Sequence, residues 1–399
     1  MSGGCEMREP LNILYLAHDL DDAAIWRRKD MFERGGATVD VVGFERKQVD
    51  RAHSALSLGT TRDGDFKQRI WRVVSNLPFL PRTIKRSGLQ RPDVIVARNM
   101  EALALGLRLK AHWGGDIPLV YELLDIHRLQ HGQSAKSKAV RAVEAWMLKS
   151  TDLVMISSEA FKTNYLDAFE MPDVPTLLIE NKVLLRDGQM LERPRPQRQV
   201  ASPERIAIGW FGILRCSWTL SQLDALTRAL PGQFEIVMRG RPALDQMPDF
   251  HETVEANPDL QFGGAYRWPD DLPSIYAECD FVWMIDRFDS GGNSDWLLPN
   301  RLYEGALFGA IPIGLNGTAI AARLQAIGIG LVLDDISLDT LAQAMSQVQR
   351  VQINSMRTDV LSQNLGKWVT DQSECRALVK TLSNLKHEPN TSGQPVMDG

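Results

Sequence analysis

The feature of this sequence that most constrains its fold is an alternation, found twice, of short β-rich runs with longer amphipathic stretches. Such an alternation is typical of parallel sheets whose strands are joined by helices. In the first half, the predicted strands are residues 13–17, 39–42, 94–97, 119–122, 153–156 and 177–179. In the second half, they are residues 206–210, 234–238, 281–285, 311–315 and 331–333. We therefore predict an α/β fold with two doubly wound, Rossmann-like domains.

A polar segment, residues 191–203, separates the two series and predicts an interdomain linker. The N-terminal domain is then residues 1–190 and the C-terminal domain residues 204–355. Residues 356–386 have helical periodicity, and residues 387–399 are expected to form a disordered tail. Two doubly wound domains that face each other place the carboxyl ends of their strands, and hence their ligand sites, on either side of one cleft.

Composition excludes several classes of protein. With 44% hydrophobic and 24% charged residues, the chain has the balance of a water-soluble globular protein rather than of a disordered one. No run approaches the ~18 apolar residues of a membrane-spanning helix, and residues 11–17 are too few for a signal sequence. The four cysteines have no CxxC spacing, which favours reduced thiols in a cytoplasm over a disulfide framework or a zinc site.

Two acidic motifs in the first half are better explained by local structure than by cofactor binding. Residues 18–22 follow the first strand, where a nicotinamide enzyme would have a Gly-rich phosphate loop. No GxGxxG occurs, so we expect these residues to cap the next helix or to bind hydroxyl groups of an acceptor substrate. Asp63-Gly64-Asp65 does not follow an apolar strand, so we interpret it as a turn and expect no metal site.

Residues 281–315 predict a strand, a polar loop, a short helix and another strand. Pro299 and Asn300 favour a helix start and Gly309 a helix end, so Glu304 is expected near the helix N-terminus. Backbone amides there favour an anion such as a phosphate, and Arg301 adds a positive charge. A carboxylate beside that site is suited to accept two ribose hydroxyls. The alternative is that Glu304 only favours the helix N-terminus.

The string PNRLYEGALFGAIPI, residues 299–313, resembles the donor-site motif of GT-B fold glycosyltransferases. Three further strings follow the family's order: IGWFGILR at 208–215, VMRGRP at 237–242 and AYRWPDDLPSIYAECDFVWMID at 265–286. In the first half, PLVYELLDIHRL at 118–129, STDLVMISSEAF and ENKV at 180–183 resemble the family more loosely. The resemblance covers nearly the whole chain. It implies the GT-B fold, with a C-terminal helix near Trp368 that crosses back to the first domain.

The resemblance implies a transferase that moves a sugar from a nucleotide-sugar in the second domain to an acceptor in the first. The donor is expected to be a UDP- or GDP-sugar, with no further cofactor. Glu304 would bind the ribose, Arg301 and Arg215 the diphosphate, and Gly212 would let the backbone approach it. The full set of implied donor-site residues is Glu304, Arg301, Asn300, Arg215, Gly212, Arg239, Arg241 and Tyr266, with Trp268 as a second aromatic. The alternative is that the arginines are surface residues and the aromatics core residues.

The sequence departs from the family at one position. Many retaining members carry two glutamates separated by seven residues, but the residue eight before Glu304 is Trp296. Asp295 is adjacent, yet a shift of one residue reorients a side chain, so it is not equivalent. The retaining mechanism is therefore disfavoured. Polar and glycine residues just upstream are expected to contact the sugar instead, unless they only make the loop flexible: Ser290, Gly291, Gly292 and Asn293.

An inverting transferase needs a general base for the acceptor hydroxyl. Glu122, Asp125 and His127 lie at or beyond the end of a predicted strand, where a doubly wound domain places its ligand loops. Asp125 is the first choice, because it resembles the acidic residue that follows this strand in some exopolysaccharide transferases, and His127 is the second. His131 is a weaker candidate. The alternative is that the first three residues only hold the loop together.

Residues 67–91 carry many basic side chains and no acidic one, with aromatic and aliphatic residues between them. This composition is typical of a segment that binds an anionic membrane surface, and it suits a lipid-linked acceptor. An ordinary amphipathic helix is the alternative, and no nucleic-acid partner is expected.

Taken together, the sequence predicts a glycosyltransferase of bacterial polysaccharide biosynthesis that acts on a glycan or lipid-linked acceptor. Its expected location is the cytoplasm, with peripheral attachment to the inner face of the membrane. Two other functions fit the same scaffold: a non-catalytic nucleotide-sugar or glycan-binding protein, and a nucleotide-sugar epimerase.

Overall fold

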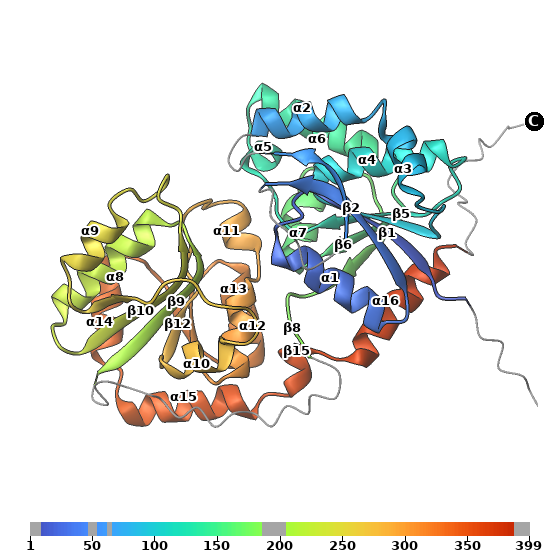
Figure 1. Ribbon diagram of the computed structural model, residues 1–399. Helices are drawn as coiled ribbons and strands as arrows, with labels where there is room; N and C mark the ends of the chain where they lie inside the picture. Colours follow the sequence, from blue (N-terminus) through green and yellow to red (C-terminus); the bar gives the residue numbers. More distant parts are fainter. Residues whose placement is uncertain (1–8, 47–53, 62–65, 186–204, 387–399) are drawn as a thin grey trace, which may run out of the picture.

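The computed structural model describes residues 9–46, 54–61, 66–185 and 205–386, which form two α/β domains side by side (Figure 1). The predicted α/β class, with two Rossmann-like domains, is confirmed. Three of the predicted segments lie outside the described residues: the linker 191–203, the tail 387–399 and the turn at 63–65.

The N-terminal domain is built on a seven-stranded parallel sheet in the order β3-β2-β1-β4-β5-β6-β7. Its strands are β1 (Asn12–Ala17), β2 (Thr38–Glu45), β3 (Leu56–Thr60), β4 (Val94–Arg98), β5 (Leu119–Leu123), β6 (Leu153–Ile156) and β7 (Thr176–Leu178). The sequence predicts six of them. It misses β3, an edge strand of mostly half-buried residues whose LSLGT composition carries little β-propensity.

Helices cover both faces of this sheet. They are α1 (Ala23–Arg34), α2 (Phe66–Asn76), α3 (Leu80–Ser87), α4 (Asn99–His112), α5 (Arg128–His131), α6 (Ala135–Leu148), α7 (Glu159–Phe161) and the π-helix η1 (Lys162–Asp167). Successive residues of β1 point to opposite faces, as strand geometry requires. Leu14 and Leu16 belong to the core with α3, α4 and α6, whereas Ile13 and Tyr15 belong to the core with α1.

The C-terminal domain has a six-stranded parallel sheet in the order β11-β10-β9-β12-β13-β14. Its strands are β9 (Ile206–Leu214), β10 (Phe234–Pro242), β11 (Leu260–Phe262), β12 (Phe281–Trp283), β13 (Ile311–Leu315) and β14 (Leu331–Leu333). Its helices are α8 (Ser217–Ala229), α9 (Phe250–Glu255), α10 (Leu272–Ala277), α11 (Asn293–Trp296), α12 (Asn300–Leu307), α13 (Ala319–Ile327), α14 (Leu338–Ser346) and α15 (Arg350–Ser362). The strand order places β9 and β12 at the centre, and both end at the cleft.

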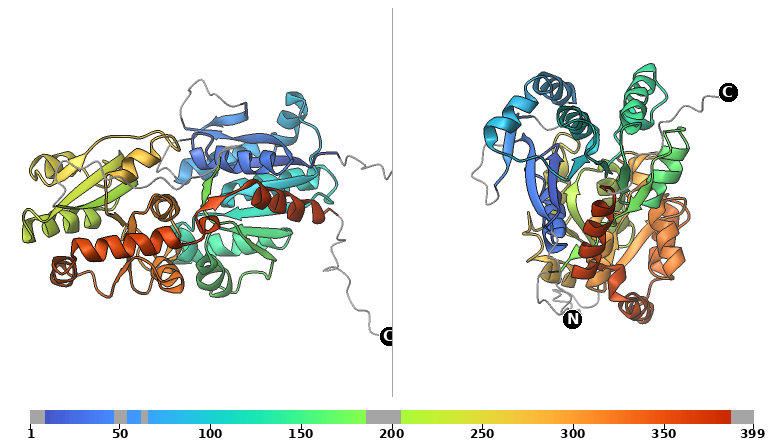
Figure 2. Two further views of the ribbon diagram at one scale, coloured as in Figure 1. Left: turned by 90° about the horizontal axis from the view of Figure 1, so that it is seen from below. Right: turned by 90° about the vertical axis from the view of Figure 1, so that its right-hand side faces the viewer.

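The C-terminal segment crosses back to the first domain, and its predicted helical stretch is divided into two helices. α15 runs through residue 356 and ends at Ser362 on the second domain, with Val360 in that domain's core. A short 3-10 turn, η2 (Leu365–Lys367), and the buried Trp368 follow, and then β15 (Val369–Thr370) pairs with β8 (Val183–Leu184). These elements form the passage between the domains, which both views of Figure 2 show.

Only the last helix, α16 (Gln372–Asn384), packs on the N-terminal domain, against α1. Cys375, Leu378 and Leu382 of α16 join the core behind β1. The approach is close, because a Cβ at Gly35 would lie 2.4 Å from the carbonyl oxygen of Cys375. Within the described parts of the chain, none of the helices combines the length and the apolar composition that crossing a membrane requires.

Candidate active site

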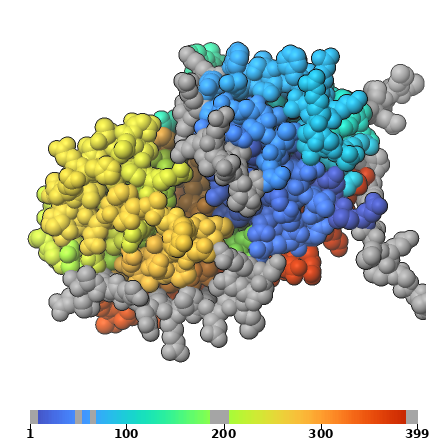
Figure 3. Space-filling view, viewed as in Figure 1, coloured from blue at the N-terminus to red at the C-terminus, as the bar shows by residue number. Residues whose placement is uncertain are grey.

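The carboxyl ends of the two sheets meet across the space between the domains, where Figure 3 shows a hollow on one face of the molecule. The loop after β5 lies against the loop after β12. The main-chain amide of Ile126 donates to Oδ1 of Asn293 at 3.2 Å, and Nδ2 of Asn293 donates to Oδ1 of Asp125 at 3.2 Å. Nε2 of His131 lies 3.1 Å from Oδ2 of Asp289. The structure therefore brings together the two loops in which the sequence predicted acceptor-side and sugar-contacting residues.

Glu304 is held by two side chains of its own domain. It is 3% exposed, and its carboxylate accepts from Nε1 of Trp268 at 2.9 Å and from the hydroxyl of Tyr276 at 3.0 Å. Burial raises the pKa of this carboxyl group. Glu304 is the fifth residue of α12, and side-chain donors rather than the first amides of the helix hold it. Because a carboxylate has about four acceptor positions, two remain for hydroxyls of a ligand.

Arg301 and Arg215 lie together at the carboxyl end of β12. Nε of Arg301 donates to the carbonyl oxygen of Trp283 at 3.0 Å, and Nη2 donates to that of Met284 at 3.2 Å. Burial lowers the pKa of Arg301, and Arg215 acts in the same direction. Arg215 pairs with Asp286 at 3.5 Å. Two guanidinium groups at the end of a central strand form a site suited to a diphosphate.

The glycine at the end of β9 leaves space beside these arginines. Gly212 has φ of 107°, and a Cβ built there would have no atom within 4 Å, so the backbone is open to close approach. Arg239 is committed elsewhere, because Nη2 donates to both carboxylate oxygens of Glu278 at 2.8 and 3.0 Å. Arg241 is exposed at the end of β10. Of the four arginines proposed for the donor, the geometry brings only Arg301 and Arg215 together.

The aromatic candidates lie beside Glu304. Tyr266 is half-buried, and burial together with the Glu304 charge raises the pKa of its hydroxyl. Trp268 donates to Glu304, so its indole is fixed by a hydrogen bond and by packing. Both rings therefore lie beside the Glu304 carboxylate.

The glycine-containing loop packs on the opposite domain. A Cβ at Gly292 would lie 2.4 Å from the imidazole of His131, so close packing requires the glycine there. The amide of Gly291 donates to Oδ2 of Asp295 at 2.6 Å, and Ser290 is exposed. Trp296 occupies the place of the missing glutamate and meets the His131 ring edge-on at 5.5 Å between centroids.

Two of the three proposed catalytic residues are exposed on the loop after β5. Asp125 is exposed and accepts from Asn293. His127 caps α5, where its Nδ1 accepts from the amide of Leu129 at 3.2 Å, and burial together with the Arg69 charge lowers its pKa. Both residues therefore lie where a group from the cleft can reach them.

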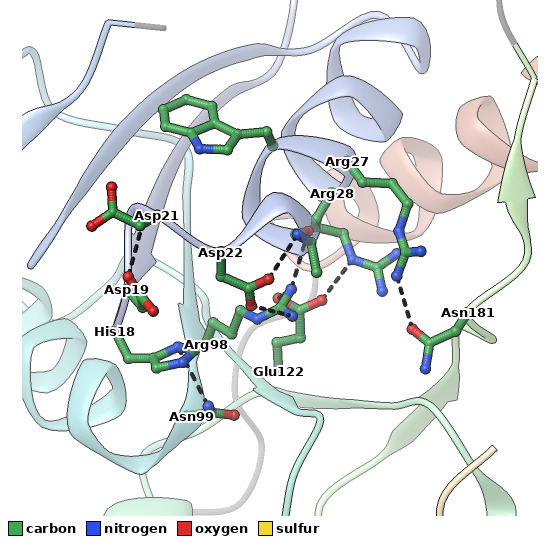
Figure 4. A network of polar contacts seen from close by, with 12 residues as sticks. His18, Asp19, Asp21, Asp22, Arg27, Arg28, Arg98, Asn99, Glu122 and Asn181 are labelled. Carbon is green, nitrogen blue, oxygen red and sulfur yellow. Dashed lines mark hydrogen bonds and ion pairs between the residues drawn. The ribbon is translucent and has the colours of Figure 1, made fainter. Parts of the chain in front are cut away.

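Glu122, the third proposed catalytic residue, is a structural group, and we correct the prediction on this point. It has no exposed surface, and its carboxylate accepts from Nε of Arg28 at 2.6 Å and from the hydroxyl of Tyr15 at 2.6 Å. Arg98 lies 3.7 Å away (Figure 4). The two arginines outweigh the effect of burial and hold the pKa of Glu122 below its usual range. As the last strand residue but one, Glu122 points into the domain rather than toward the cleft.

The motif at residues 18–22 caps a helix, as predicted, and also places a histidine that the sequence did not single out. Oδ1 of Asp22 accepts from the amide of Ala24 at 2.9 Å at the start of α1. His18 follows β1 directly, and its Nδ1 lies 3.4 Å from Nδ2 of Asn99 (Figure 4). Asn99 has φ of 67°, and its Oδ1 is buried without a hydrogen-bond partner among the described residues. The position of His18 at a strand end was the available signal.

Arg27 is a second residue that the sequence did not single out. It projects from α1 toward the other domain, where Nη2 donates to Oδ1 of Asn300 at 3.3 Å. Nη2 also donates to Oδ1 of Asn181 at 3.2 Å, and the guanidinium lies 5.7 Å from the Trp268 ring centroid. Burial and the neighbouring Arg28 lower the pKa of Arg27 to about 10. A periodicity argument assigns such a residue to a solvated helix face, so only the tertiary structure identifies it.

Comparisons with known proteins agree with this architecture. Residues 23–182 match the family described as glycosyl transferase 4-like domain. The chain is 42% identical over 386 residues to the succinoglycan biosynthesis protein ExoL of Rhizobium meliloti (strain 1021), with 94% of each chain covered. Among solved structures, sucrose-phosphate synthase from Thermosynechococcus elongatus superposes with a TM-score of 0.69 at 14% identity, covering 94% of this chain and 96% of that one.

HepE of Anabaena, solved in complex with UDP-glucose, superposes with a TM-score of 0.63 at 18% identity, covering 94% of this chain and 100% of that one. At these identities the two solved structures establish the likeness of fold.

Proposed function

The chain belongs to the GT-B glycosyltransferases of exopolysaccharide biosynthesis, and on that premise we propose that it transfers a sugar from a UDP-sugar to a lipid-linked saccharide acceptor. The observation that carries the proposal is the buried Glu304, held by Trp268 and Tyr276 near Arg301 and at the edge of the cleft. The UDP-glucose in HepE, a protein of the same fold, supports uracil as the base.

On the donor side, the two free acceptor positions of Glu304 take the ribose hydroxyls, and Arg301 and Arg215 face the diphosphate. These two arginines neutralise the charge that grows on the diphosphate as its bond to the sugar breaks. Gly212 leaves space for the phosphates at the end of β9. In this proposal the protein supplies the positive charge itself, and no metal ion takes part.

On the acceptor side, Asp125 accepts the proton of the attacking hydroxyl. The oxygen of that hydroxyl forms the new bond to the sugar, and UDP leaves with the electrons of the broken bond. Asp125 suits this role because it is exposed and because Asn293, on the loop that borders the donor site, orients its carboxylate. His127 is the second candidate for the same role.

We also propose that residues 67–91 attach the enzyme to an anionic membrane surface, where a lipid-linked acceptor is found. Large apolar side chains there are exposed to solvent, among them Trp71 at 62% and Phe79 at 60%. Arg82, Lys85 and Arg86 are exposed on α3 nearby. An apolar surface flanked by cations fits the interface of an anionic bilayer.

The test of donor binding is a calorimetric titration of UDP, UDP-glucose, GDP and GDP-mannose into the wild type and Glu304→Ala. We expect uridine nucleotides to bind the wild type selectively. The loss of hydrogen bonds to a charged group should weaken binding by ~1.5 to 3 kcal/mol, roughly tenfold to over a hundredfold. Glu255→Ala, a change of an exposed glutamate on α9, is the matched control. Equal affinity of Glu304→Ala and wild type would refute the assigned role.

A further inference from the structure

Helix α6 presents a stripe of apolar side chains to the outside of the molecule. Trp146 is 66% exposed and Val143 is 50% exposed, and the smaller Ala139 and Ala142 are exposed as well. These residues follow one another at intervals of one, three or four, so they lie on one face of the helix. We refer to Ala139, Ala142, Val143 and Trp146 as the α6 stripe. Exposed tryptophan and valine on the same helical face require an explanation, because isolated surface apolar residues do not cluster in this way.

The opposite face of α6 is fixed to the domain, so the stripe has a defined direction. Glu144 is fully buried, accepting from the hydroxyl of Tyr121 at 2.8 Å and from Nε2 of Gln130 at 3.0 Å, and the hydroxyl of Tyr165 also donates to it. Met147 and Leu148 lie in the core of the domain. The helix therefore cannot rotate to bury Trp146 without breaking these contacts.

The charges that α6 itself exposes beside the stripe have one sign. Lys136, Lys138 and Lys149 are exposed on α6 and at its C-terminal cap. Glu144 is the only acidic residue of α6, and it is buried, so the outer face of the helix carries no negative charge. An apolar stripe flanked by lysines matches the interface of an anionic bilayer, where apolar groups enter the headgroup region and lysines meet lipid phosphates.

The α6 stripe lies at the same end of the N-terminal domain as α2 and α3. Figure 1 shows these helices at the upper end of the domain, and the right-hand view of Figure 2 shows α6 on the other side of this end from α2 and α3. Residues 67–91 and α6 are separated in sequence by more than forty residues. Both nevertheless expose a tryptophan together with lysine or arginine side chains at this end of the domain.

We propose that α6 is a second membrane-contacting element, and that the α6 stripe and residues 67–91 together seat the N-terminal domain on an anionic lipid surface. Two separate points of contact define the orientation of the domain, which one amphipathic segment alone does not. α6 follows directly on α5, whose first and last residues, Arg128 and His131, contact Asp289 across the cleft. Membrane contact through α6 therefore brings the acceptor side of the cleft close to the bilayer surface.

The inference rests on the proposed function only for the reason that the enzyme would bind a membrane. The experiment measures lipid binding separately from donor binding and transfer. Full-length protein is co-sedimented, without nucleotide or acceptor, with vesicles of phosphatidylglycerol and phosphatidylcholine and with vesicles of phosphatidylcholine alone. Trp146→Ser should lower the partition coefficient on the mixed vesicles by roughly tenfold or more, because a large apolar side chain no longer enters the interface. Changing Lys136, Lys138 and Lys149 to Gln should lower it by about fivefold per lysine on the mixed vesicles and little on the neutral ones.

Matched controls come from the rest of the chain. Val351→Ser changes an apolar residue that is 77% exposed on α15, and Lys380→Gln changes an exposed lysine on α16. Both should partition like the wild type. All of these side chains are exposed, so circular dichroism should show an unchanged fold.

Wild-type partitioning of Trp146→Ser would overturn the proposal. So would a change from dimer to monomer in light scattering with unchanged vesicle binding, because the stripe would then be an interface between two copies of the chain. UDP-glucose titration gives an independent result. A protein that binds vesicles through α6 but binds no nucleotide would refute the proposed function and leave this inference standing. A protein that binds UDP-glucose but not vesicles would refute this inference and leave the proposed function standing.

Discussion

Glu304, on the proposed donor side of the cleft, is 3% exposed and is bound by two side chains of its own domain, whereas Asp125, on the proposed acceptor side, is exposed and is bound by Asn293 of the opposite domain. Arg301 resembles Glu304, since both of its hydrogen bonds go to carbonyl groups of its own domain. A buried group with local partners keeps its position whatever the other domain does. The difference indicates that Glu304 and Arg301 are held within one domain, while the hydrogen bond to Asp125 forms only where the two domains meet.

The largest effect is expected for Asp125→Asn, which tests the acceptor side alone. The amide keeps an oxygen that accepts from Asn293 but does not take up the acceptor proton. Turnover should fall by about 10²- to 10⁴-fold, while the affinity for UDP-glucose stays within about twofold. Transfer is measured with a radiolabelled donor. Glu255→Gln, a change of an exposed glutamate on α9, is the control, and unchanged turnover of Asp125→Asn would remove the assignment.

The next largest effect is expected on the stability of the N-terminal domain, through the buried ion pairs of Glu122. Glu122→Gln leaves the buried Arg28 without its counter-charge and Arg98 with Asp22 alone, so the free energy of unfolding should fall by ~3 to 5 kcal/mol. Chemical denaturation measures this change. Glu374→Gln breaks a more exposed pair with Lys182 and should cost at most ~1 kcal/mol. Similar losses in the two variants would show that the buried Glu122 network stabilises the domain no more than an exposed ion pair does.

A smaller effect should separate the arginines of the donor side. Arg215→Met removes a cation beside Asp286 and Arg301, and it should weaken UDP binding by ~1.5 to 3 kcal/mol in calorimetry. Arg239→Met removes a cation that is already bound by Glu278, and nucleotide affinity should hardly change. If Arg239→Met weakens binding as much as Arg215→Met, the diphosphate lies elsewhere than at the end of β12.

The smallest effect is a pair of opposite pH dependences. Burial and the Arg98 charge lower the pKa of His18 below its ordinary 6.5, so the unfolded chain binds more protons just below that pH and stability rises with pH through that interval. Burial raises the pKa of Glu304 above its ordinary 4.5, so the folded chain binds more protons just above that pH and stability falls as pH rises through that interval.

Single variants should separate the two slopes. His18→Asn should remove the rise and Glu304→Gln the fall, measured by chemical denaturation across about pH 4 to 8. Wild-type slopes in both variants would mean that neither group differs between the folded and unfolded chains.

The strands and the domain pair were predictable because they rest on local composition. Central strands such as β1 and β13 are continuous apolar runs, and these mark a parallel sheet whatever the rest of the chain does. The edge strand β3 and the three-residue β11 were missed, because half-buried residues at a sheet edge carry no such run. The break between α15 and α16 was missed because Trp368 fits a helical period yet is buried in the passage between the domains.

By itself, the sequence determined the two-domain α/β architecture, and it singled out the motif around Glu304 that we propose as the donor site, since strand runs, helix caps and a contiguous motif are properties of neighbouring residues. Only the tertiary structure decided that Glu122 is a buried ion-pair partner, that Arg239 pairs with Glu278, and that Arg27 reaches Asn300 of the other domain. These outcomes depend on contacts between polar and charged groups that lie more than twenty residues apart in the sequence. Hydrogen bonding and burial between such distant residues leave no periodic trace in the sequence.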